Sequence, residues 1–267
     1  NDLSGYGRCS LTVAIPVLSA MGHQCCPIPT AILSNHTEFP VYFFDDYTEK
    51  MTTYTDKWKE LGLSFDAIAT GFLGSEAQIG IVMEIVQKLK AEKTFVVVDP
   101  VMGDHGHAYE TYTPEMCEQM KELVCMADVV LPNVTECCIL TDTPYREENW
   151  TRKELLNMAM MLRLMGAKSV VITGVREGSY YTNVVLERGQ MEAKFIRTRS
   201  SGGERPGTGD VFSSVVAGAL LNGKSLPEAV SQAAGFVKEC IKVSDEEQIP
   251  HANGVCFEKI LGKLIKK

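Results

Sequence analysis

Four consecutive residues, Gly207-Thr208-Gly209-Asp210, open a long apolar segment, VFSSVVAGALL, and could carry out proton-transfer chemistry. Glycines at a helix start allow a tight turn that aims successive backbone N–H groups at one point, where an anion is stabilised. Asp210 would lie in the first helical turn and could accept the proton of an attacking hydroxyl. An ordinary helix start, in which the acidic side chain only complements the helix dipole, explains the same four residues equally well.

A second motif, Asn133-Val134-Thr135-Glu136, follows the apolar run DVVL at residues 128–131. An amide and a carboxylate at such a strand end suit the hydration shell of Mg²⁺ beside phosphates, because Mg²⁺ keeps several waters and takes few protein ligands. An asparagine N-cap followed by a capping-box glutamate would produce the same spacing. Both interpretations remain open from the sequence.

A third motif, DPVMGD from Asp99 to Asp104, follows the apolar run TFVVV at residues 94–98. Acidic residues at the carboxyl end of a buried parallel strand lie where open α/β sheets bind ligands. The glycines at 103 and 106 and the polar residues that follow predict a mobile loop over residues 103–113, able to cover a site.

Short β-branched runs alternate with amphipathic helices, and this alternation would position the motifs. The expected strands span residues 65–70, 94–98, 128–131 and 169–173, and the expected helices span residues 10–21, 78–90, 225–242 and 254–266, with a further helix opening at residue 207. A hairpin is expected from residues 179–187 and 190–197, with its turn at Arg188-Gly189. The order predicts an α/β fold with a doubly wound, mostly parallel central sheet flanked by helices on both faces. We expect a single domain over residues 1–267, whose first strand would precede residue 1.

The composition limits the class of protein. Of the 267 residues, 45% are apolar and 22% charged, which indicates a folded globular chain. The net charge of −8 argues against a nucleic-acid partner. The sequence contains no run of eighteen apolar residues, so we predict no transmembrane helix. Nine cysteines, an odd number lying mostly in apolar segments, predict free buried thiols in a reducing compartment and hence a cytoplasmic protein.

Taken together in chain order, DPVMGD, NxxE and GTGD resemble the motifs of the ribokinase-like kinases. The opening SGYGRCSL, the segment LSNHT at residues 33–37 and the loop at residues 103–113 are similar to the pyridoxal kinase branch in particular. The resemblance extends over essentially the whole chain. It implies ATP as co-substrate, Mg²⁺ as cofactor with a monovalent cation as a further candidate, a pyridoxal-type vitamer as partner, and a homodimer.

The resemblance also implies a role for particular residues. Asp210 would be the catalytic base, and Gly207, Thr208 and Gly209 would form the anion hole. The nucleotide would be contacted by Asp99, Asn133, Glu136, Thr173 and Gly174, and the metal by Asp104 and Glu136. The pyridine-type substrate would be contacted by Asp2, Thr37, Phe72 and Tyr112.

The implied activity is phosphorylation of the 5′-hydroxymethyl group of pyridoxal, pyridoxine or pyridoxamine. A hydroxymethylpyrimidine kinase of the same fold is an alternative, because its substrate is also a flat heteroaromatic ring with a primary alcohol. A non-catalytic vitamin-binding protein that retains the fold is a second alternative. The intact GTGD motif, with Asp210 in it, favours catalysis.

Overall fold

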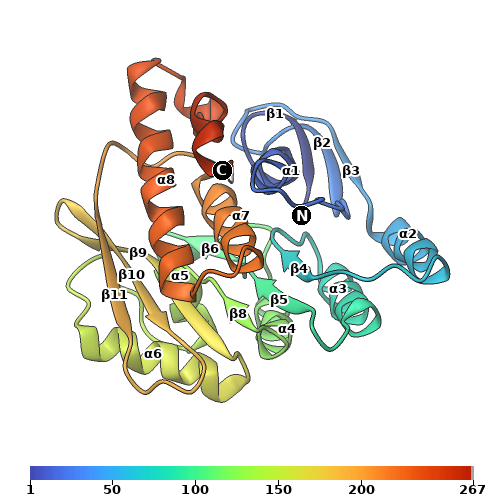
Figure 1. The fold of residues 1–267 in the computed structure, drawn as a ribbon, viewed down its shortest axis with the longest axis horizontal. Coiled ribbons are helices and arrows are strands. Elements are labelled where there is room, and N and C mark those ends of the chain that lie inside the picture. The colour runs from blue at the N-terminus through green and yellow to red at the C-terminus, as the bar shows by residue number, and fades with distance from the viewer. Residues whose placement is uncertain (266–267) are drawn as a thin grey trace. The chain divides into compact units, whose positions relative to one another are not determined.

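The computed structural model describes residues 1–265. The backbone gathers into two compact units: unit 1 comprises Asn1–Glu49 and Thr198–Lys267, and unit 2 comprises Lys50–Arg197. Figure 1 shows the course of the chain. Within the described residues, no helix combines the length and apolar character that a membrane crossing requires.

Unit 1 combines a small sheet with a group of helices. Its three strands are β1 (Leu3–Tyr6), β2 (Ala31–Asn35) and β3 (Phe44–Asp46). They are ordered β1-β2-β3, with β2 parallel to β1 and antiparallel to β3. The helical elements of this unit are α1 (Ser10–Ala20), α7 (Thr208–Leu221), α8 (Leu226–Glu246) and the 3-10 turns η1 (His251–Asn253) and η2 (Glu258–Leu264). Helix α7 is buried over most of its surface because it contacts both α1 and α8 (Figure 1).

Unit 2 contains a six-stranded sheet with the order β11-β10-β9-β8-β5-β4. These strands are β4 (Ala67–Thr70), β5 (Phe95–Val98), β8 (Val129–Val130), β9 (Ser169–Glu177), β10 (Tyr180–Leu186) and β11 (Lys194–Arg199). Strands β4, β5, β8 and β9 are parallel, and β10 returns antiparallel to β9. The accompanying helices are α2 (Thr48–Glu60), α3 (Glu76–Leu89), α4 (Pro114–Cys125), α5 (Val134–Leu140) and α6 (Arg152–Met165). The predicted α/β class, a mostly parallel sheet with flanking helices, is confirmed (Figure 1).

The continuous apolar runs became the centre of this sheet. Val96 and Val98 of β5 and Val170 and Ile172 of β9 are completely buried. Strands buried on both faces need no alternation of polar and apolar residues, which is why their sequences are uninterrupted. All nine cysteines are free, and five of them are buried, as predicted.

Three expected segments differ from the structure. No strand was expected ahead of the loop at residues 5–10, yet Leu3–Tyr6 pairs with β2 as β1, a pairing that depends on backbone contacts with a distant segment. The predicted turn at Arg188-Gly189 is present, but β11 begins only at Lys194. The segment expected to be a helix over residues 254–266 is not an α-helix where the structure describes it: residues 254–257 are irregular and buried, and the 3-10 element η2 spans Glu258–Leu264. Lys266 lies outside the described residues.

Two smaller features involve loops. The segment expected to be a mobile loop begins instead as a two-stranded hairpin of β6 (Gly103–Asp104) and β7 (His107–Ala108). The aromatic segment 41–44 leads into an edge strand, because Phe44 opens β3 of the small sheet.

Candidate functional site

The start of α7 has the tight geometry predicted for the GTGD motif. Gly207 is the N-cap and has a left-handed φ of 78°. A Cβ atom added there would overlap the carbonyl oxygen of Arg8, so only glycine fits this position. A Cβ added to Gly209 would meet open space. The N–H groups of the first turn have no acceptor inside the helix, so they are available in principle to an anion.

Asp210 lies in that first turn with several polar neighbours from unit 1. Its carboxylate accepts a hydrogen bond from the Ser10 backbone amide, and the Asn1 side-chain amide lies 3.4 Å from Oδ1. Burial raises the pKa of Asp210 to about 6, the nearby Asp2 charge adds to the rise, and the Ser10 amide opposes it. The residue as a whole is only partly exposed, and its carboxyl lies in surroundings that disfavour its charge.

Asp2 lies beside Asp210 in the same unit, and its side chain is only 7% exposed. Its Oδ1 accepts a hydrogen bond from the Ser10 hydroxyl at 2.5 Å, and its Oδ2 accepts one from the Ser4 hydroxyl at 2.8 Å. Both oxygens therefore already have protein donors. Thr37, the other predicted polar contact of the substrate ring, is exposed just beyond the end of β2.

In unit 2, the NxxE motif forms the capping box at the start of α5. The Glu136 amide donates to Asn133 Oδ1 at 2.9 Å, and the Asn133 amide donates to Glu136 Oε2 at 2.8 Å. The same side chains hold the DPVMGD segment, because the Met102 amide donates to Glu136 Oε1 at 3.2 Å and Asn133 Nδ2 donates to the Gly103 carbonyl at 2.9 Å. The capping interpretation is thus confirmed, and the motif also joins the loops that follow β5 and β8.

Acidic groups are concentrated around this capping box. Glu136 is 3% exposed, and burial, followed by the charges of Asp99 and Asp104, raises its pKa well above the ordinary value despite the two backbone donors. The Tyr112 hydroxyl is buried and has no hydrogen-bond partner among the described residues. Its pKa is raised by burial and then by Glu136 and other neighbouring groups. A cation would relieve the repulsion within this group of carboxyls.

The residues fit a magnesium ion that keeps most of its water. Both Glu136 oxygens are engaged by backbone amides, so this residue suits hydrogen bonding to metal-bound water, while the exposed Asp104 can offer a carboxylate oxygen. Across residues 1–265, no group of three or more His, Cys, Asp and Glu side chains is arranged to hold a metal ion. The magnesium site therefore stays a prediction.

The remaining predicted nucleotide contacts follow the neighbouring strand. Thr173 of β9 forms an isolated parallel bridge with Asn133, and its amide donates to the Pro132 carbonyl at 2.8 Å. Gly174 has a left-handed φ of 68° and is exposed with open space above it. Phe72 follows β4, Asp99 follows β5 and Asn133 follows β8, at the carboxyl ends of three parallel strands. Thr173 and Gly174 instead lie within β9.

Two residues that contact the predicted site segments were not identified from the sequence. Ser10 has a positive φ of 52°, and Thr135 accepts a hydrogen bond from the Gly106 amide at 2.9 Å. A serine carries no sequence signal for a left-handed conformation. Thr135 lies inside the NxxE motif, so its position could have been considered.

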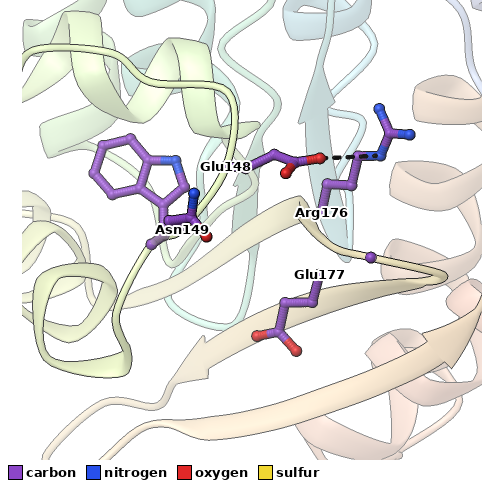
Figure 2. A pocket seen from close by; sticks show the side chains of 6 residues that line it. Glu148, Asn149, Arg176 and Glu177 are labelled. Atoms are coloured by element: carbon purple, nitrogen blue, oxygen red, sulfur yellow. Dashed lines mark ion pairs between the residues drawn. The ribbon is translucent and has the colours of Figure 1, made fainter.

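A pocket elsewhere in unit 2 contains none of the predicted site residues. Its lining residues come from the loop before α6, the end of β9 and the turn that follows it: Glu148, Asn149, Trp150, Arg176, Glu177 and Gly178 (Figure 2). Arg176 and Glu148 form an ion pair at 3.9 Å across it.

A mostly parallel α/β sheet, a glycine-capped helix with an acid in its first turn and an NxxE capping box are the features of the ribokinase-like kinases. Comparison with known sequences agrees: the family described as phosphomethylpyrimidine kinase matches residues 15–256. The chain belongs to this family and is a kinase that phosphorylates an alcohol substrate.

Individual relatives are of two kinds. The chain is 30% identical over 249 residues to a pyridoxine kinase of Bacillus subtilis, covering 90% of this chain and 80% of that protein. It is 32% identical over 174 residues to a hydroxymethylpyrimidine/phosphomethylpyrimidine kinase of Aquifex aeolicus, covering 64% of this chain and 66% of that protein, just under two thirds of its length. The crystal structure of a candidate phosphomethylpyrimidine kinase from Bacteroides thetaiotaomicron with pyridoxal has a TM-score of 0.92 and 39% identity, covering 98% of this chain and 93% of that one.

Proposed function

We propose that this kinase transfers the γ-phosphoryl group of ATP to the 5′-hydroxymethyl group of pyridoxal or a related vitamer. The observation that carries the proposal is Asp210, an acid with a pKa near 6 in the first turn of a glycine-capped helix. The relatives named for vitamin B6, and the pyridoxal in the Bacteroides thetaiotaomicron structure at 39% identity, support the choice of acceptor.

In the proposed reaction, Asp210 accepts the proton of the acceptor alcohol. The alcohol oxygen forms a bond to the γ-phosphorus, and the bond from phosphorus to the bridging oxygen breaks, so that ADP leaves and the 5′-phosphate forms. A base with a pKa near 6 is largely ionised at neutral pH and yet basic enough to assist the attack. The amides of residues 207–209 would stabilise charge on the transferring phosphoryl group.

The residues of unit 2 would bind the nucleotide. We propose that Asp99, Asn133 and Glu136 lie near its phosphates and Mg²⁺, with Asp104 as a metal ligand, and that Thr173 and Gly174 contact it along β9. Mg²⁺, when bound, neutralises charge on the β- and γ-phosphates. Thr37, Phe72 and Tyr112 are the proposed substrate contacts, and the assignment of Asp2 is taken up below.

Hydroxymethylpyrimidine is the second candidate acceptor. The family match and the Aquifex aeolicus relative, 32% identical, favour it. Both acceptors are flat heteroaromatic primary alcohols, so the same base and the same anion hole would serve either. The two candidates therefore differ in the ring that is recognised and share the chemistry.

The proposal is tested by steady-state kinetics of the purified protein with Mg²⁺ and ATP. Pyridoxal, pyridoxine, pyridoxamine and hydroxymethylpyrimidine are compared by their kcat/KM values, with phosphorylated product identified by mass spectrometry. We expect pyridoxal 5′-phosphate to form with a higher kcat/KM than the pyrimidine product. A clear preference for the pyrimidine would make hydroxymethylpyrimidine the acceptor in place of pyridoxal. Vitamin binding without ATP consumption would favour the non-catalytic alternative.

Asp210→Asn provides the matched control for chemistry. The substitution keeps the shape of the side chain and removes the base, so kcat should fall by about 10²- to 10⁴-fold. Binding of the acceptor, measured by calorimetry, should persist. Turnover close to that of the wild type would remove Asp210 from the mechanism.

A further inference from the structure

Ser10 combines an unfavourable backbone conformation with a contact to the proposed base. It is the first residue of α1, and its φ of 52° lies in the left-handed region that favours glycine. Its backbone amide donates to the Asp210 carboxylate. A non-glycine residue holds such a conformation only where its surroundings over-determine it, and such residues gather at functional sites.

The surroundings that hold Ser10 come from Asp2. The Ser10 hydroxyl donates to Asp2 Oδ1 at 2.5 Å, and the amide of the next residue, Leu11, donates to the Asp2 carbonyl at 3.1 Å. The Ser4 hydroxyl fixes the other carboxylate oxygen of Asp2 at 2.8 Å. Asp2, Ser4, Ser10 and Leu11 are all buried, so water does not compete for these hydrogen bonds.

We propose that Asp2 and Ser10 are positioning residues for the catalytic base: Asp2 holds the Ser10 hydroxyl, the hydroxyl holds the left-handed turn, and the turn aims the Ser10 amide at Asp210. This inference rests on the proposed function, in which Asp210 deprotonates the acceptor. It assigns Asp2 a role through Ser10, because Asp2 is buried and each of its oxygens accepts a hydrogen bond from a protein hydroxyl.

The consequence for catalysis concerns orientation. One amide donor on the Asp210 carboxylate restricts its rotation, so that a defined oxygen faces the acceptor alcohol. Small displacements of reacting groups cost large factors in rate, and orientation is what such a donor supplies. Since the helix α1 begins at Ser10, the amide is fixed to a rigid element.

Two substitutions at Ser10 separate the turn from the hydroxyl. Ser10→Ala removes the hydrogen bond to Asp2 and leaves a residue that avoids positive φ, so we expect kcat to fall about tenfold or more with KM for pyridoxal changed less than about twofold. Ser10→Gly also lacks the hydroxyl but tolerates positive φ, so it should recover most of that loss. Gln248 is the matched control: it has the same φ of 52° and is exposed at the end of α8. Gln248→Ala and Gln248→Gly should leave kcat and KM unchanged.

Asp2→Ala and Asp2→Asn test the other partner. Asp2→Ala should lower kcat as Ser10→Ala does, and Asp2→Asn, which keeps an acceptor for the Ser10 hydroxyl, should recover part of the loss. In Asp2→Asn, which keeps an acceptor for the Ser10 hydroxyl, removing the Asp2 charge should also move the acid limb of the pH profile to lower pH, since that charge disfavours ionisation of Asp210. The Cys9 thiol also faces Asp210 and is the same in every variant.

A carbon-13 titration of the Asp210 carboxyl gives a readout that needs no turnover. In Ser10→Ala the lost amide donor should raise the pKa of Asp210 above its value in the wild type, while both Gln248 variants should leave it unchanged. Equal loss in Ser10→Ala and Ser10→Gly, or a rise in KM for pyridoxal with kcat unchanged, would overturn the inference, as would an unshifted Asp210 pKa. A wild type without activity on any alcohol would instead overturn the proposed function, and the titration would still decide the role of Ser10.

Discussion

At the scale of single residues, Asp210 is subject to opposing requirements. A base must be ionised to accept a proton, whereas burial and the neighbouring Asp2 disfavour its charge. The Ser10 amide offsets part of that penalty and leaves the pKa of Asp210 at about 6. Such a value suits a general base that acts near neutral pH, and it has separate consequences for rate and for stability.

The rate should depend on pH through the ionisation of Asp210. Because the base acts only when deprotonated, kcat/KM should be constant near pH 8 and fall below about pH 6, by about tenfold for each further pH unit. The measurement is a profile of kcat/KM from pH 5 to pH 9 at saturating Mg²⁺ and ATP. An acid limb centred near pH 4, the ordinary aspartate range, would show that Asp210 in its surroundings does not control the reaction.

The stability of the fold should also depend on the Asp210 carboxyl, but in the opposite direction: the protonated form favours folding, whereas the ionised form is needed for the reaction. The folded-state pKa of about 6 lies above the ordinary value of 3.8, so the folded state binds more protons between these values. The contribution of this carboxyl to stability is therefore fully present below about pH 4 and is lost as the pH rises through 6. We expect Asp210→Asn, which carries no charge, to have a higher Tm than the wild type at pH 8 and a smaller difference at pH 5. Asp142→Asn, at an exposed carboxylate, is the control and should change Tm little at either pH.

At the scale of elements, the start of α7 depends on close contact between two loops. Gly207 lies against the Arg8 backbone, and Arg8 itself pairs with Glu258 at 2.7 Å and donates to the Asn253 carbonyl at 3.0 Å. The loop that leads into α1 is thereby held between the N-terminus of α7 and the C-terminal 3-10 turns. The first turn of α7 therefore packs against a loop that the C-terminal turns hold in place.

Gly207→Ala should therefore lower the free energy of unfolding by more than the strain of a left-handed backbone would lower it alone. A left-handed alanine costs about 1–2 kcal/mol, and overlap with the Arg8 carbonyl should add about 1–3 kcal/mol. Gly223→Ala is the matched control, because Gly223 has a similar φ of 81° with open space for a Cβ atom. This variant should lose only the stability that the left-handed alanine costs, about 1–2 kcal/mol. Chemical denaturation measures both. Equal losses in the two variants would show that the contact with Arg8 does not constrain the turn.

The elements also show which features a sequence can reveal. The capping box at Asn133 and the glycine start at 207 leave local marks, so their helices could be predicted, as could the valine runs of β5 and β9. The conformation of Ser10 depends on Asp2 and Asp210, the second of which is 200 residues away, and no local pattern encodes it. The same holds for β1, whose pairing partner β2 begins 28 residues later.

At the scale of the whole molecule, unit 1 is built from both ends of the chain. Its contacts between α1 and α7, and between Asp2 and Asp210, join residues about 200 positions apart. The boundaries fall inside α2 and β11, so each crossing from one unit to the other runs through a regular element. Long-range contacts of this kind close only when most of the chain has folded. The single domain expected from the sequence stays a prediction.

We therefore predict that the two units unfold together. Both tryptophans, Trp58 and Trp150, belong to unit 2, so tryptophan fluorescence, excited selectively, reports that unit alone. Three buried thiols, those of Cys9, Cys240 and Cys256, belong to unit 1. Their alkylation during unfolding, followed by peptide mass spectrometry, therefore reports the unfolding of unit 1. In urea the two signals should share one midpoint, as a two-state transition requires. Midpoints that differ would divide the chain into two domains, with the unit that unfolds at lower urea being the less stable. Saturating nucleotide with Mg²⁺ should raise a shared midpoint for both signals, because a ligand that binds only the folded state stabilises everything that unfolds with its site.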